Sequence, residues 1–169
     1  NYVGQQLDLL EAAFLNLYPD TTLARCLPLK LLLCGQLDWR TTAGRSTLYN
    51  TYSTFDGLAF NWGNENILTM TQAQKITFKN DVNVTFLKRI LDTGKIVEHA
   101  EFYDGVTYAT AITNQTMYGR GFLNRSTKVE NDVEYYVEAI VSNTYEDLIA
   151  EYPATNYTNK GILNPVKDV

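Results

Sequence analysis

A short apolar run from Leu29 to Leu37 limits the folds open to this chain more than any other feature. Pro28 precedes the run and Gly35 lies near its end, and a run of this length and composition is typical of a buried central strand. Helical patterns occur on both sides of it along the sequence. A buried strand between helices predicts an α+β fold, in which several helices pack on a small sheet.

Apolar residues recur at spacings of three and four in three segments, and this spacing places them on one face of a helix. The three segments are residues 4–18, 71–92 and 131–152. Thr71 with Gln74 three residues later predicts a capping box at the start of the second helix, and Gly94 predicts a stop after it. A weaker pattern favours a helix over residues 104–117. Further expected elements are a helical turn over residues 22–26 and strands over residues 48–55 and 58–62.

Length and charge restrict the classes of protein to consider. The 169 residues suit one domain, and we expect a single domain over residues 1–169. The net charge is −5 and no more than two Lys or Arg are adjacent, which argues against binding to nucleic acid or to anionic lipid. Because the chain begins at Asn1, we expect a trimmed form, and any membrane attachment would be through a lipid anchor lost from its N-terminus.

The scarcity of histidine excludes most familiar hydrolytic sites, since His99 is the one histidine. A helical zinc hydrolase site needs two histidines four residues apart with a glutamate between them. His99 with Glu98, Glu101 and Asp104 could form a mixed carboxylate–imidazole site, although such loop clusters are usually solvated. We therefore expect no catalytic residue, no metal and no cofactor.

Two other groups of reactive residues have ordinary explanations. Glu130, Glu134 and Glu138 fall on one face of the expected last helix and could hold a cation or act as acid and base. The polar face of an amphipathic helix is the commoner interpretation of such a row. Cys26 and Cys34 lie in the most apolar part of the chain, where a thiolate is disfavoured, so we expect free thiols rather than nucleophiles.

Aromatic residues are concentrated between positions 39 and 62. Four of them are the candidate ligand-binding residues, because such a cluster can form a stacking platform for a sugar or a peptide. These candidates are Trp39, Tyr49, Tyr52 and Trp62. The alternative is that the inward-facing members of the cluster close the core over the sheet.

The order of several short motifs resembles that of a known family. Leu17-Tyr18-Pro19 ends the first helix, an apolar segment over residues 27–33 enters the strand, and Gly121-Phe122 precedes an acidic, aromatic helix that begins near Asp132. In this order the motifs resemble those of the substrate-import-associated zinc metallohydrolase lipoproteins of Bacteroidetes. The resemblance implies a zincin-like scaffold and a lipid-anchored protein at the surface of a bacterial outer membrane. It also implies partners, namely a TonB-dependent transporter and a SusD-like lipoprotein.

Members of that family carry His-Glu-x-x-His on the long central helix. The corresponding stretch is Asn80-Asp81-Val82-Asn83-Val84, in which Asp81 keeps an acid and both histidine positions hold other residues. The resemblance therefore implies a degenerate zincin-like scaffold without its zinc site. No catalytic residue of the family can be carried over to this chain.

We therefore expect a non-catalytic accessory lipoprotein of a SusC/SusD-type import complex, which captures peptides or glycans. One alternative is a carboxylate-dependent hydrolase such as a glycosidase, which needs two facing acids. The candidate acids are Glu98, Glu101, Glu134 and Glu138. The other alternative is a purely structural subunit, which would expose an extensive apolar surface.

Overall fold

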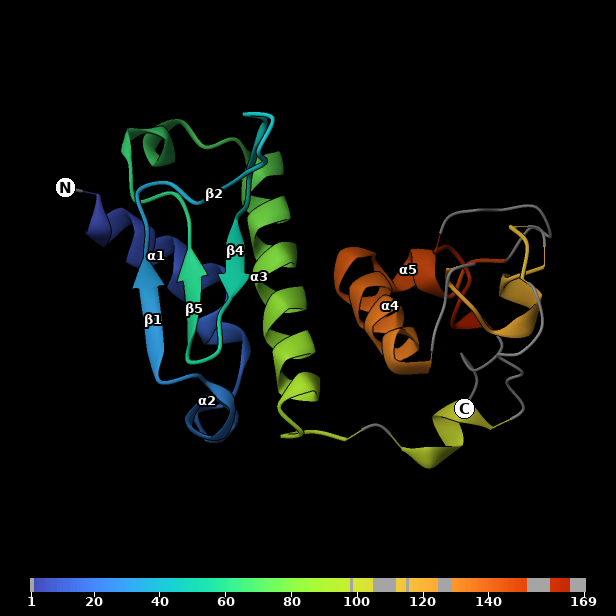
Figure 1. The fold of residues 1–169 in the computed structure, drawn as a ribbon. Coiled ribbons are helices and arrows are strands. Elements are labelled where there is room, and N and C mark those ends of the chain that lie inside the picture. Colours follow the sequence, from blue (N-terminus) through green and yellow to red (C-terminus); the bar gives the residue numbers. More distant parts are fainter. Residues whose placement is uncertain are drawn as a thin grey trace. The chain divides into compact units, whose positions relative to one another are not determined.

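The computed structural model describes residues 2–97, 99–104, 112–114, 116–124, 129–151 and 159–164. The chain divides into two compact units, an N-terminal unit (Asn1–Ile96) and a C-terminal unit (Val97–Val169). Helices and a small sheet are both present, so the predicted α+β class is confirmed (Figure 1). The prediction of a single domain over residues 1–169 stays a prediction.

A three-stranded sheet forms the centre of the N-terminal unit. Its order is β1–β5–β4, with β1 (Lys30–Leu33) parallel to β5 (Gly57–Phe60) and β4 (Thr51–Ser53) antiparallel to β5. All four residues of β5 are buried. The prediction of a buried central strand over residues 29–37 is wrong, because β1 lies at the edge and its first three residues are exposed. The hairpin that joins β4 to β5 places β4 on the second side of β5, and β5 becomes the central strand.

Two helices, α1 (Val3–Ala13) and α3 (Gln72–Asp92), pack on one face of this sheet (Figure 1). Leu58 and Phe60 on β5 point to that face, because side chains two residues apart lie on the same side of a strand. Both side chains are fully buried among apolar residues of the helices. The other buried members of this core are Leu10, Ala13, Phe14, Met70, Phe78, Val82, Phe86 and Ile90.

The ends of α3 confirm the sequence prediction. The Thr71 side chain accepts a hydrogen bond from the Gln74 backbone, and the Gln74 side chain accepts one from the Thr71 backbone. The helix ends at Asp92, and Gly94 follows with a φ of +64°, a backbone conformation that glycine adopts without steric cost.

The helical segment before the sheet is broken into three parts. The predicted helix over residues 4–18 consists of α1 and the 3-10 turn η1 (Leu15–Leu17), because Phe14 leaves the helical conformation with a φ of −140°. The predicted turn over residues 22–26 is the short helix α2 (Asp20–Cys26), which begins directly after Pro19.

A separate two-stranded ribbon lies between β1 and β4 along the chain. It consists of β2 (Asp38–Arg40) and β3 (Ser46–Leu48), which are antiparallel. The predicted strand over residues 48–55 is therefore divided between the end of β3 and β4. The predicted strand over residues 58–62 corresponds to β5, and the 3-10 turn η2 (Glu65–Thr69) follows it.

The C-terminal unit is mainly helical in its described parts. The predicted helix over residues 131–152 consists of α4 (Val129–Ser142) and α5 (Tyr145–Leu148). The break arises at Thr144, whose side chain accepts a hydrogen bond from a backbone N–H of α5 and so begins a new helix. The predicted helix over residues 104–117 falls mostly outside the described residues, and those described there are not helical.

A ring contact and a hydrogen bond join three of the described segments of the C-terminal unit. The ring of Phe102 in η3 (Ala100–Tyr103) meets the ring of Tyr136 edge to face, with 5.5 Å between centroids. The Tyr136 hydroxyl donates to the carbonyl of Gly121, which follows the 3-10 turn η4 (Tyr118–Arg120). Among the described residues of this unit, the buried apolar side chains are Met117, Phe122, Ala139 and Leu148.

A polar contact joins the start of the chain to α3 beside the core of the N-terminal unit. The Tyr18 hydroxyl donates to Asn83 Oδ1 at 2.8 Å, and Asn83 Nδ2 donates to the carbonyls of Ala13 and Lys79. Asn83 is buried, so the amide needs these partners. Partial burial raises the pKa of Tyr18 to about 12.

This raised pKa predicts how Tyr18 contributes to stability at alkaline pH. In the unfolded chain the Tyr18 hydroxyl ionises near pH 10, whereas in the folded protein it keeps its proton to about pH 12. Its contribution to the free energy of unfolding is therefore complete below pH 10 and is lost as the pH rises through about 12. We expect Tyr18→Phe to lower the free energy of unfolding by about 1 kcal/mol at neutral pH. This difference from the wild type should shrink at alkaline pH.

The measurement is urea denaturation, followed by circular dichroism, of the wild type and Tyr18→Phe at a series of pH values. Tyr49→Phe is the matched control because the Tyr49 side chain is exposed. A difference between the wild type and Tyr18→Phe that stays constant across the alkaline range would contradict the prediction.

Candidate binding cleft

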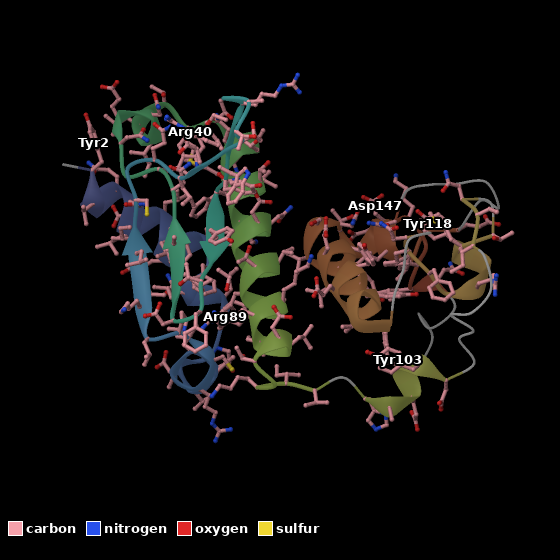
Figure 2. The ribbon with its side chains drawn as sticks, in the orientation of Figure 1. Tyr2, Arg40, Arg89, Tyr103, Tyr118 and Asp147 are labelled. Carbon is pink, nitrogen blue, oxygen red and sulfur yellow. The ribbon has the colours of Figure 1, made fainter. Side chains whose placement is uncertain are left out.

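A cleft lies where β1 and β5 end. Because these strands are parallel, their carboxyl ends meet at one edge of the sheet, and ligands of open α/β sheets bind outside such edges. Two adjoining cavities of about 660 and 150 Å³ share Gln36, Asn64 and Asn66 in their walls. We call the two together the carboxyl-edge cleft. Tyr2, Gly35, Gly63 and Glu65 complete the larger cavity, and Leu48, Asn61 and Trp62 complete the smaller one. Figure 2 labels Tyr2 at this end of the unit.

A buried amide from α1 ties the two strand ends together under the cleft. Only 1% of Gln6 is exposed, and its Nε2 lies 3.3, 3.1 and 2.7 Å from the carbonyl oxygens of Cys34, Phe60 and Asn61. One of these carbonyls follows β1 and the other two lie at the end of β5. Because buried carbonyls need partners, Gln6 holds both strand ends in a set position.

Gly63 brings the two strand ends into direct backbone contact. Its N–H donates to the Cys34 carbonyl at 2.9 Å. A Cβ added at Gly63 would lie 2.7 Å from Gln6 Oε1 and 2.9 Å from the Cys34 oxygen, closer than real Cβ atoms come. The floor of the cleft therefore requires glycine at position 63.

Trp62 has a strained backbone, and a network of neutral side chains holds it. Its φ is +79°, the left-handed region in which a bulky residue is an outlier that costs about 1–3 kcal/mol. The Trp62 N–H donates to Asn61 Oδ1 at 2.7 Å, and the indole Nε1 donates to Asn50 Oδ1 at 2.8 Å. Asn50 Nδ2 in turn donates to the Asp81 carboxylate on α3 at 2.7 Å. Strain of this kind clusters at ligand sites, and here it places an aromatic ring in the wall of the inner cavity.

The structure separates the four aromatic candidates of the sequence analysis. Trp62 lines the cleft, whereas Tyr49 and Tyr52 contact each other outside it, with ring centroids 6.5 Å apart. Trp39 lies on β2 beside Asp38, which pairs with Leu48, so Trp39 points to the opposite side of the ribbon from Leu48 in the cleft wall. Trp39 also makes no ring contact with the other described aromatic residues.

Sequence reasoning missed the amide side chains that form most of the polar wall. Asn64 Nδ2 donates to the Gly35 carbonyl, and Asn64 Oδ1 accepts from the Asn66 N–H at 2.9 Å, so Asn64 closes the turn after β5. Within the described part of the chain, the side-chain amide of Asn66 has no hydrogen-bond partner, and Gln36 Nε2 has only a 3.4 Å contact with Asp38. The sequence did contain a signal, because an amide residue follows each of the two strands: Gln36 after β1 and Asn61 after β5. These residues form a pattern only once β1 and β5 are known to be neighbours.

The cleft is almost free of charge. Glu65 is the one carboxylate among its described lining residues, and no Lys, Arg or His lines it. An anionic ligand would find no cation there, and two facing acids of a glycosidase are not present among these residues. The cleft can therefore bind a neutral ligand through hydrogen bonds and ring stacking.

The carboxylates considered from the sequence do not line this cleft where the structure describes them. Glu98 and the side chain of Glu130 lie outside the described residues. His99 Nδ1 accepts a 3.4 Å hydrogen bond from the Glu101 N–H, and both side chains are more than three-quarters exposed, as expected of a solvated loop. Glu134 and Glu138 lie along α4. In the parts of the chain that the structure describes, no three His, Cys, Asp or Glu side chains are grouped so that they could hold a metal ion.

The residues of α3 do not fit the zinc site that the family resemblance would place there. Asn80 and Val84 occupy the expected histidine positions and offer no imidazole. Asp81 is exposed, and its carboxylate accepts the hydrogen bond from Asn50. Both cysteines, Cys26 and Cys34, are free thiols as predicted, although both are half-buried rather than buried. No described helix is long and apolar enough to cross a membrane.

The requirement for glycine at position 63 can be tested with a matched pair of variants. We expect Gly63→Ala to lower the free energy of unfolding by about 1–3 kcal/mol, because its Cβ must displace the Gln6 amide or part the strand ends. Gly35→Ala is the control, since its Cβ would meet only the Gly63 oxygen at 3.6 Å, an ordinary contact. Urea denaturation measures the free energy of unfolding of both variants. An equal decrease in the two would contradict the requirement for glycine at position 63.

Comparisons with known proteins supply no relative from which a function could be transferred. No family model matches the chain, and neither a curated protein nor a solved structure matches it significantly. The resemblance to the metallohydrolase lipoproteins therefore stays a prediction, and the function has to be argued from the cleft.

Proposed function

We propose that this protein is a non-catalytic binding module that captures a neutral ligand, a glycan or a peptide, in the carboxyl-edge cleft. The observation that carries the proposal is Trp62, whose strained backbone is held by Asn61 and Asn50 so that its ring lines a cavity. Neutral amides form most of the rest of the polar wall, which also includes Glu65. Amides bind and orient a ligand but do not readily gain or lose a proton, and Glu65 is the one carboxylate among the described lining residues.

The setting we propose is an accessory lipoprotein of a SusC/SusD-type nutrient import complex at the surface of a bacterial outer membrane. Its partners would be the TonB-dependent transporter and the SusD-like lipoprotein, and its scaffold a degenerate zincin-like one. The order of sequence motifs is the observation that supports this setting.

One observation favours the second candidate, a structural subunit. Leu29, Leu31 and Leu32 are 91, 37 and 43% exposed along the edge strand β1 and the residue before it. An exposed apolar edge of this kind is suited to contact with another chain. Contact with an import complex and capture of a ligand are compatible, because β1 ends where the cleft begins.

Ligand capture is tested with the immobilised protein and mixed pools of oligosaccharides and peptides. We expect ligands to be retained and recovered intact, as shown by mass spectrometry. Trp62→Gly removes the ring and suits the left-handed backbone, so this variant should fold and lose about tenfold or more in affinity. Trp39→Ala, outside the cleft, should stay within about twofold of the wild type.

Two results would overturn the capture proposal. The first is equal retention by the wild type and Trp62→Gly, with circular dichroism showing that both are folded. The second is release of shortened products, which would indicate an enzyme. If those products disappear in Glu134→Gln or Glu138→Gln, the carboxylate-dependent alternative is correct.

The setting is tested by affinity capture of the full-length protein from native outer membranes. We expect a TonB-dependent transporter and a SusD-like lipoprotein to copurify in stoichiometric amounts. Leu32→Glu, which adds a charge to the exposed edge strand, should reduce their recovery while ligand binding in the cleft is kept. Recovery of the protein without a transporter would contradict the import setting and leave the binding result standing.

A further inference from the structure

We infer that the ligand of the carboxyl-edge cleft is a neutral oligosaccharide, one ring of which stacks on Trp62. This inference rests on the proposed function, since it names the substrate class of the same cleft. Three properties of the cleft carry it: the size of the inner cavity, the kind of polar group in the wall, and the larger cavity that adjoins the inner one.

The inner cavity is suited to a single ring. Its volume of about 150 Å³ is below the roughly 300–1,000 Å³ typical of pockets for drug-sized ligands. Trp62 and Leu48 supply its apolar walls. A sugar ring presents C–H groups on its faces and hydroxyl groups at its edge, so a face can pack on an indole while the edge meets polar side chains.

The polar wall matches hydroxyl groups. Gln36, Asn64 and Asn66 each carry two N–H donors and a carbonyl acceptor, and a sugar hydroxyl both donates and accepts. Asn64 is oriented by its own hydrogen bonds, whereas Gln36 and Asn66 are exposed and their amides keep most of their capacity for a ligand at the surface. A ligand that uses these groups would avoid leaving them unpaired when the cleft loses its water.

The larger cavity extends the site beyond one ring. It is lined in part by Tyr2 and Glu65, has a volume of about 660 Å³, and shares three amides with the inner cavity. Figure 2 shows Tyr2 at the amino end of α1, at the rim of this side of the unit. Further sugar units can therefore continue outward from the ring on Trp62, which favours an oligosaccharide over a monosaccharide.

A peptide fits these observations less well. Extended peptides are commonly bound along a free strand edge, whereas the cleft lies across strand ends whose backbones bond to each other at Gly63 and Cys34. The described lining residues offer no cation for a peptide carboxylate. Glu65 is the one group that would favour a peptide, through the amino terminus of the ligand, and the test separates this case.

The test is isothermal titration of the purified protein with two panels of probes. One panel contains neutral linear oligosaccharides built from glucose, xylose or mannose. The other contains peptides of similar size, with free or blocked termini. We expect binding to the oligosaccharides alone, with an affinity that added salt leaves unchanged because the ligand is neutral. Glu65→Gln should leave this affinity within about twofold of the wild type.

Variants of the lining residues test whether the Trp62 ring and the amides contribute to binding. Trp62→Gly should abolish measurable binding, and Trp62→Tyr should restore part of it because tyrosine again offers an aromatic face. Gln36→Ala and Asn66→Ala should each weaken binding about fivefold or more, and Trp39→Ala should not. Thermal unfolding of every variant shows which of them are folded.

The failures of the two proposals are distinguishable. If peptides bind, oligosaccharides do not, and Trp62→Gly loses the peptide, the cleft is a binding site and the oligosaccharide inference is wrong. If the peptide is also lost in Glu65→Gln, the ligand is recognised through its amino terminus. If neither panel binds, or binding is the same in folded Trp62→Gly, both proposals fail.

Discussion

The rest of the N-terminal unit depends on the buried amide of Gln6. A side chain on α1 contacts three carbonyls at the ends of β1 and β5, two strands that lie far from it in sequence. Its Oε1 has no hydrogen-bond partner in the described structure and lies where a side chain at Gly63 would have to be. Helix, strand ends and glycine therefore constrain one another. The cleft is the outer surface of this junction, and its shape follows from contacts made beneath it.

The strain at Trp62 is a consequence of the same junction. The chain leaves β5 and must turn at once, because the Gly63 N–H is hydrogen-bonded to the carbonyl of Cys34, the residue that follows β1. Trp62 takes the left-handed conformation at this turn, and hydrogen bonds to Asn61 and Asn50 offset its cost. Asn50 links the ring to Asp81 on α3, so a polar position on the long helix supports the cleft.

Elements with strong local signals could be predicted from the sequence, and the candidate site mostly could not. Helix α3 has its capping box at Thr71, its apolar stripe and its glycine stop, and all three act within a few residues. The apolar composition of the run from Leu29 predicted a central strand. A strand is central only if other strands pair with both of its sides, and among the described strands β1 pairs with β5 alone. Of four aromatic candidates, Trp62 alone lines the cleft, because alternation along β2 turns Trp39 to the other side of the ribbon.

The sequence by itself determined the α+β class, the position of the long helix and the scarcity of histidine. These properties depend on composition and on spacings of a few residues. The tertiary structure alone decided that residues 35–36 and 61–66 line one cleft, with an aromatic ring, several amides and one carboxylate in its wall. The reason is that strand pairing joins segments some 25 residues apart in sequence, and no local pattern encodes which strand ends will meet.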